Sequence, residues 1–323
     1  MAAKLTGRFL VSRLTPNTPT IAAFLAIVVL GGGNGVAVRV SNQQLAPLWG
    51  ATLRFGLAAM LLVAVVAIRR IPFPSGAALT GSVLYGLLGF AGAFGLIYWS
   101  LVTTPAGIGQ MILALVPLLT FLFAISQGLE RFRLQGIAGA LLALGGIATI
   151  FGNQLSGGAS AIRLLALVGA AACMAASNVV VKAFPKCHPV ANNAVGMALG
   201  SLVLFALSFV SGEPHILPPD RRTWIAVAYV SLAGAAGVFS LFLYVIRRWS
   251  ASSTSYVMLL MPLVTLSLAA AISGEPIAPM VVFGGALVLI GVYLGAFASL
   301  SRRRPAARIV VRAVPLPNHP GCA

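Results

Sequence analysis

The sequence predicts an all-α polytopic membrane protein in which ten transmembrane helices form two inverted five-helix repeats. Three observations lead to this fold class. The chain of 323 residues is 59% hydrophobic and only 8% charged, whereas a soluble domain carries about 25% charged residues. Ten apolar runs follow one another, most of them close to the roughly 20 residues that a membrane span requires. A set of residues in the first half of the chain recurs in the second half.

The apolar runs are separated by short turns, and glycine or proline marks most of the breaks. Ten spans leave both chain ends on one side of the membrane. We therefore expect a tail at 1–19, five-helix repeats at 20–155 and 160–298, and a basic tail at 299–323. The runs cover residues 20–38, 47–68, 78–100, 105–127, 134–152, 163–183, 189–211, 223–246, 251–273 and 278–298.

The distribution of basic residues predicts which side the ends occupy. Of the 21 lysines and arginines, sixteen fall in segments on the same side as the N-terminus, four fall on the other side, and Arg54 falls inside a span. Cytoplasmic loops of membrane proteins are enriched in basic residues. We therefore expect a protein of the cytoplasmic membrane with both termini cytoplasmic. The same bias explains the formal charge of +17 without a nucleic-acid partner.

Two stretches of the chain read as copies of each other, "LVPLLTFLFAISQGLERFRLQGIAGALLALGGI" and "LMPLVTLSLAAAISGEPIAPMVVFGGALVLIGV". Because five spans is an odd number, the second copy must enter the membrane from the opposite face. Inverted repeats are characteristic of secondary transporters, whose substrate site lies near the midplane between the repeats. The matched residues are Pro117 with Pro262, Thr120 with Thr265, Glu130 with Glu275, Gly139 with Gly284, Asn34 with Asn178, Arg39 with Lys182, and Tyr98 with Tyr244.

These motifs, together with "GGNGVAVRV" and "PLWGATLRFGLAAMLLV", resemble EamA-type members of the drug/metabolite transporter superfamily. The resemblance covers nearly all of residues 20–298. It implies ten helices around a central cavity and alternating-access transport of small metabolites, with export as the expected direction. The first copy departs from the usual pattern because Leu129 separates glycine from glutamate in "GLERF". The resemblance is unspecific for the substrate.

Arg54 is the most informative single residue, because an arginine inside a span usually faces a cavity or a partner. One interpretation is contact with an anionic or zwitterionic substrate, since a guanidinium group suits a carboxylate or phosphate. The other is structural, with the side chain reaching outward or bonding to helix-end carbonyls. The second repeat has no matching charge.

Further candidates for substrate contact are polar or aromatic residues within the spans. An amide in lipid seeks a partner across helices, so the two matched asparagines bind either substrate or a backbone group. Aromatic residues near span ends also form interfacial belts, which is the alternative for the tyrosines. These candidates are Asn34, Asn178, Tyr98, Gln110, Tyr244 and Tyr256.

Three matched pairs are candidates for hinges or gates. Each proline removes a backbone hydrogen bond from its span, each glutamate precedes a helix whose N-terminus favours a carboxylate, and the two basic residues lie at opposite mouths. Static kinks, helix capping and interfacial anchoring are the alternatives. The residues are Pro117, Pro262, Glu130, Glu275, Arg39 and Lys182. Glu213 and Asp220, beside two arginines, read as a solvated charge cluster.

The function expected from these observations is transport of a small polar metabolite. A site with arginine, asparagine and tyrosine suits an amino acid or a related carboxylate-bearing compound. No span carries an acidic residue near its centre, which disfavours exchange of protons for cationic drugs. A flippase for a lipid-linked sugar and an integral membrane lipid-modifying enzyme are the alternatives. The three cysteines and three histidines show no metal-ligand spacing, we expect no cofactor, and faces of small residues would allow a homodimer.

Overall fold

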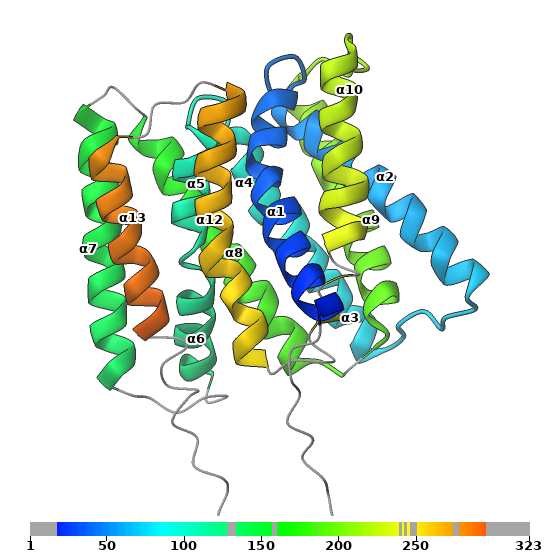
Figure 1. Cartoon of the computed structure of the whole chain (residues 1–323). Helices are drawn as coiled ribbons and strands as arrows, with labels where there is room; N and C mark the ends of the chain where they lie inside the picture. The colour runs from blue at the N-terminus through cyan, green and yellow to red at the C-terminus, as the bar shows by residue number, and fades with distance from the viewer. Residues whose placement is uncertain are drawn as a thin grey trace, which may run out of the picture.

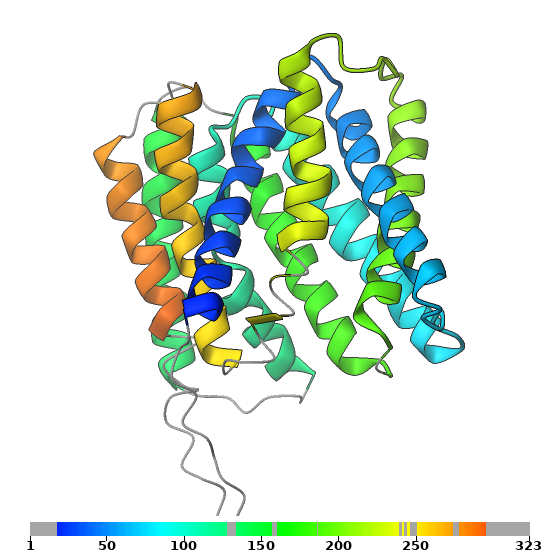
Figure 2. The ribbon, with the colours of Figure 1, turned by 45° about the vertical axis from the view of Figure 1, so that its right-hand side comes forward.

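The computed structural model describes residues 18–127, 134–156, 160–185, 187–238, 241, 244–245, 251–273 and 278–294. All regular secondary structure in these residues is helical, and the helices stand side by side in one bundle (Figure 1). Two views of the ribbon show that the start of α1 (Thr18–Ser41) and the end of α13 (Pro279–Val292) lie at the same end of this bundle (Figures 1 and 2).

Helical residues occupy each of the predicted apolar runs. The bounds of α2 (Pro47–Ile68) and α12 (Ala251–Ser273) agree with the prediction, and α8 (Ala161–Ala183) and α9 (Pro189–Val210) differ from it by one or two residues at an end. In the part of the chain that the structure describes, six helical stretches are long and apolar enough to cross a membrane. Shorter apolar helices accompany them at Leu141–Asn153, Leu260–Ile272 and Pro279–Gly291. The protein is therefore an all-α polytopic membrane protein.

Three of the predicted runs are divided into shorter helical pieces. Two of these runs contain a π-helical segment, which has a wider turn than an α-helix and often marks a functional site. The pieces are α3 (Ala77–Tyr85), η1 (Gly86–Gly92) and α4 (Ala93–Ser100) in the third run, α5 (Ala106–Leu113) and α6 (Val116–Ser126) in the fourth, and α10 (Arg221–Ala228) and η2 (Tyr229–Gly237) in the eighth.

Proline positions explain where several helices begin. Pro47, Pro189 and Pro279 are the first residues of α2, α9 and α13, where the missing N–H has no helical acceptor to lose. Pro117 is the second residue of α6. Pro262 is different, because it lies inside the continuous helix α12. The two matched prolines therefore occupy different local structures, and the expected loss of a mid-span hydrogen bond applies to Pro262.

Glycines allow some helices to approach closely. An added Cβ atom at Gly146 of α7 (Leu134–Ser156) would lie 2.5 Å from the carbonyl oxygen of Gly284, and one at Gly291 would lie 2.6 Å from that of Gly139. Backbone contact of this kind holds helices together in lipid, where the hydrophobic effect does not. The helices α7 and α13 consequently form a tight pair at one edge of the bundle (Figure 1).

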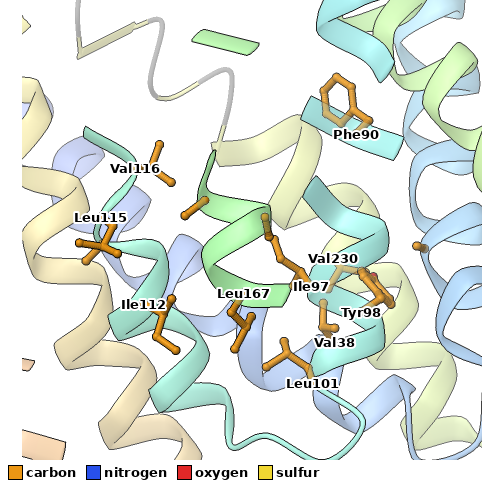
Figure 3. Close-up of a cluster of buried hydrophobic side chains, with 14 of the residues drawn as sticks. Val38, Phe90, Ile97, Tyr98, Leu101, Ile112, Leu115, Val116, Leu167 and Val230 are labelled. Atoms are coloured by element: carbon orange, nitrogen blue, oxygen red, sulfur yellow. The ribbon is translucent and has the colours of Figure 1, made fainter. Parts of the chain in front are cut away.

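The interior and the exterior are both apolar. A core cluster joins side chains from most of the helices, and Tyr98 lies in it beside Val38 and Val230 (Figure 3). On the outside, long apolar side chains such as Met60, Leu202 and Phe209 are more than 60% exposed. A continuous apolar surface of this size indicates a lipid environment.

Candidate functional site

Arg54 of α2 lies in the interior, with only 3% of its surface exposed. The central carbon of its guanidinium group is 5.1 Å from the ring centre of Phe55 and 4.8 Å from that of Phe94. Such cation–π contacts stabilise a desolvated cation. Its Nε and Nη1 atoms are buried and have no hydrogen-bond partner among the described residues. Because an unpaired buried charge is costly, the arrangement favours a partner from outside the chain.

Two tyrosines lie within electrostatic reach of this arginine. Tyr98 of α4 is fully buried, and its hydroxyl also lacks a hydrogen-bond partner in the described structure. Tyr229, the first residue of η2, is the second. Its hydroxyl donates a hydrogen bond of 2.7 Å to the carbonyl oxygen of Leu30. Tyr229 is absent from the sequence-based candidates, because nothing in its neighbourhood distinguishes it from an interfacial aromatic residue.

The glycine-rich stretch of α1 brings Asn34 to the same region. An added Cβ atom at Gly33 would lie 2.4 Å from the Tyr229 hydroxyl, so only glycine leaves room for this ring. The Asn34 amide packs onto Gly234 of η2, and its Oδ1 atom is buried without a hydrogen-bond donor. We call Arg54, Tyr98, Tyr229 and Asn34 the Arg54 cluster. It combines side chains from four different helical elements, and three of them carry polar atoms without partners.

Asn178, the residue matched to Asn34, is in a different environment. It is exposed at the surface of α8, and its Nδ2 atom donates a hydrogen bond of 3.3 Å to the Thr120 hydroxyl of α6. The structure therefore does not bring Asn178 into the Arg54 cluster. The two asparagines are equivalent in sequence and differ in burial.

The structure places the remaining substrate-contact candidates outside the cluster or leaves them undescribed. Gln110 is half-buried on α5. Tyr244 packs beside an apolar group of α1 and α12 side chains that includes Ile27 and Met261. Tyr256 lies on α12, but its side chain is outside the described residues.

Among the gating candidates, Arg39 has a clear structural contact. Its Nη1 atom donates a hydrogen bond of 2.6 Å to the Thr104 carbonyl, which ties the end of α1 to the loop before α5. Lys182 belongs to α8, and its side chain is outside the described residues. Glu130 and Glu275 also lie outside them.

The two described acidic residues cap helices, so their interpretation as a solvated charge cluster is wrong. Glu213 accepts hydrogen bonds from the Leu48 and Trp49 backbone N–H groups at 3.2 and 2.9 Å, at the start of α2. Asp220 accepts one of 2.7 Å from the Thr223 N–H at the start of α10. Carboxylates at these positions satisfy N–H groups that the helix leaves unpaired. Within the described residues, no three His, Cys, Asp or Glu side chains come together as a metal site.

The chain is similar to several membrane transporters over most of its length. It is 28% identical over 290 residues to the "Uncharacterized inner membrane transporter YedA" of Escherichia coli K12, covering 85% of this chain and 92% of that protein. It is 28% identical over 293 residues to the "Probable amino-acid metabolite efflux pump" of Salmonella typhimurium, covering 86% and 95%. It is 29% identical over 293 residues to the "Probable terminal-alkyne amino-acid exporter" of Streptantibioticus cattleyicolor, covering 88% and 92%.

The fold is shared with a protein of known structure. A chain described as "Crystal structure of protein" superposes with a TM-score of 0.60 and 19% sequence identity, covering 90% of this chain and 100% of that one. The model of the "EamA-like transporter family" matches this sequence twice, at residues 10–152 and 161–297. The chain therefore belongs to the EamA-like transporter family.

Proposed function

We propose that this protein is a secondary transporter that exports a small polar metabolite across the cytoplasmic membrane by alternating access. Amino acids and related carboxylate-bearing compounds are the substrates that the site suits best. Two relatives bear names that describe amino-acid-related efflux or export. The Arg54 cluster, with its unpaired donors and acceptor in the interior, is the substrate site of this proposal.

The packing of the helices supports two inverted repeats at 20–155 and 160–298. In this arrangement α1 is equivalent to α8, α2 to α9, α7 to α13, and α6 to part of α12. The equivalent helices α2 and α9 pack against each other, as do α7 and α13. The helix α1 packs along α12, and α8 packs along α6, as an exchange of the two halves would require. The position of both described chain ends at one end of the bundle also agrees with this proposal (Figure 1).

The observation that carries alternating access is a difference between equivalent contacts. Thr265 of α12 is fully buried, and its hydroxyl donates a hydrogen bond of 2.6 Å to the Gly32 carbonyl of α1. An added Cβ atom at Gly32 would lie 2.7 Å from the Cβ atom of Val264, so these helices are in tight contact.

The equivalent contact in the other half is looser. Thr120 of α6 is half-buried, and Asn178 of α8 is exposed. A pair of inverted halves that is closed at one contact and open at the other is the arrangement expected of one end state of a transporter. With a cytoplasmic N-terminus, the closed contact faces outward and the open contact faces the cytoplasm.

Counterflow in reconstituted vesicles tests the transport function. Vesicles loaded with an unlabelled compound from a panel of amino acids and other small carboxylates are diluted into a trace of the labelled compound. We expect transient accumulation of label for at least one compound, and none in vesicles without protein. Absence of accumulation for the whole panel contradicts the proposed substrate class.

Cysteine labelling tests the alternating access. In a variant without Cys173, Cys187 and Cys322, single cysteines replace either Asn34 or Asn178. Without substrate, we expect a polar thiol reagent to modify Asn178→Cys from the cytoplasmic side and to leave Asn34→Cys unmodified. A transported substrate should raise the labelling of Asn34→Cys from outside and lower that of Asn178→Cys. Labelling of both positions from one side contradicts the mechanism.

A further inference from the structure

The Arg54 cation has no counter-ion in the described structure, and this points to the charge of its ligand. Of the chain's four acidic residues, the described ones are Glu213 and Asp220. Both bind elsewhere, Glu213 to the start of α2 and Asp220 to the start of α10. The guanidinium of arginine does not deprotonate in proteins. Its charge in the interior must therefore be balanced by something that binds there.

We infer that the Arg54 cluster selects a monoanion, a small monocarboxylate whose remaining part is uncharged, over both zwitterions and dianions. The inference rests on the proposed transport function and specifies the substrate class of that same site. A monoanion and one guanidinium form a neutral pair. A zwitterion brings no net charge, so the site keeps its excess positive charge, and a dianion leaves an excess negative charge. In an interior of low polarity, each uncompensated charge is costly.

The positions of the neighbouring side chains favour a carboxylate as the anionic group. Phe55 and Phe94 present ring faces to the guanidinium, and these faces accept no N–H···O bond of the kind that a carboxylate provides. The buried Nε and Nη1 donors remain for an oxygen acceptor. Hydrogen bonds from arginine to a carboxylate are among the strongest in proteins because both groups are charged.

Tyr98 and Tyr229 have different roles in this site. The Tyr98 hydroxyl is fully buried and without a partner beside Arg54, so it can donate a hydrogen bond to the second carboxylate oxygen. The Tyr229 hydroxyl already donates to the Leu30 carbonyl. The unpaired Oδ1 atom of Asn34 can accept a hydrogen bond from a neutral hydroxyl or amide N–H on the same ligand. The site thus contains donors for one carboxylate and an acceptor for one neutral donor.

Ligand-dependent thermal unfolding of the purified protein in sulfate buffer tests the inference, because a ligand of the folded state raises the melting temperature. The probes share a scaffold and differ in charge: phenylpyruvate as monoanion, phenylalanine as zwitterion, its methyl ester as cation and phenylsuccinate as dianion. A second series uses pyruvate, alanine, alanine methyl ester and succinate. We expect the monoanion of at least one series to bind about tenfold more tightly than its zwitterion, or ~1.4 kcal/mol.

Variants show whether Arg54 causes this preference. Arg54→Gln should abolish it, Arg54→Lys should retain part of it because the charge remains, and Tyr98→Phe should weaken binding of the monoanion. Arg163→Gln is the matched control, because Arg163 also lies over an aromatic ring, that of Trp99, but donates a hydrogen bond to the Trp99 carbonyl. It should leave the preference unchanged.

Several results would overturn the inference. These are equal binding of monoanion and zwitterion, a preference that persists in Arg54→Gln, stabilisation by chloride as strong as by the carboxylates, or no stabilisation by either series. The counterflow assay separates this failure from failure of the proposed function. Flux of zwitterions without charge preference would keep the transporter and remove the inference. Charge-selective binding without any flux would do the reverse.

Discussion

At the scale of the residue, Arg54 differs from the other described arginines in having a buried guanidinium with unpaired N–H groups. Arg39 and Arg163 both donate to backbone carbonyls, those of Thr104 and Trp99. Residues that serve binding are often retained at a cost to the stability of the fold. An arginine that only stabilised helix packing would be expected to have its donors satisfied.

Replacing Arg54 by methionine should separate these roles. Removing a buried, unpaired charge is neutral or stabilising when an apolar side chain of similar volume replaces it. We therefore expect Arg54→Met to unfold at the same or a higher temperature than the unchanged protein without ligand, and to lose counterflow by about tenfold or more, ~1.4 kcal/mol. Arg163→Met should instead lower the melting temperature. A large loss of stability in Arg54→Met would indicate a structural role.

Asp220 provides a test of helix capping that depends on pH. The hydrogen bond from the Thr223 N–H lowers the pKa of the Asp220 carboxyl below its ordinary value of 3.8. A lowered pKa in the folded state means that the stabilisation is present above 3.8 and disappears as the pH falls through the lowered value. Hydrogen exchange at the start of α10 should therefore show equal protection between about pH 5 and 8, once the intrinsic exchange rates are corrected for.

Two substitutions complete this test. Asp220→Ala removes the acceptor and should reduce the protection throughout that range, whereas Asp220→Asn keeps an acceptor and should retain most of it. Equal protection in Asp220→Ala and the unchanged protein would show that the cap contributes nothing to α10.

At the scale of the element, the two π-helical segments are the feature that sequence patterns could not reveal. The segment η1 contacts α8 and α9, and η2 contacts α1 and α2. Under the proposed repeat, each segment contacts the first two helices of the opposite half. A π-turn accommodates one extra residue in a helix, and hydrophobicity over a 24-residue run such as Ala77–Ser100 does not register that addition.

The pairing of α7 with α13 leads to a prediction with a neighbouring control. An added Cβ at Gly146 meets backbone atoms of α13, including the Gly284 carbonyl oxygen at 2.5 Å, whereas one at Gly145 meets nothing within 4 Å. Gly146→Ala should therefore lower the free energy of unfolding by about 1–3 kcal/mol through overpacking. Gly145→Ala should be neutral or stabilise by up to about 1 kcal/mol through helix propensity. Denaturant titration in detergent measures both, and equal effects would contradict the close contact.

At the scale of the whole molecule, the number of spans determines where the chain ends lie. The start of α1 and the end of α13 occupy one end of the bundle (Figure 2). We predict that fluorescent-protein fusions at either terminus will fluoresce and that alkaline phosphatase fusions at either terminus will be inactive, because both termini are cytoplasmic. Activity of the phosphatase at one terminus alone would require an odd number of crossings and would contradict the inverted repeat.

The fold was largely predictable from the sequence, because apolar runs of span length have few alternatives to helices. Arg54 was identifiable for the same reason, as a charge within such a run. Tyr229 was not, because its role depends on a glycine of α1, Gly33, almost 200 positions earlier. The different burial of Asn34 and Asn178 was also unpredictable, since matched motifs imply equal environments and the conformation of the protein makes them unequal.

The Glu213 cap has a consequence for biosynthesis. The N–H groups of Leu48 and Trp49 receive their acceptor from a residue 165 and 164 positions later. When α2 leaves the ribosome, that carboxylate has not yet been translated, so the beginning of α2 must rely on water or lipid headgroups until α9 is inserted. A truncated chain ending after the first five spans would keep this defect permanently, and it should be degraded faster than the full-length protein.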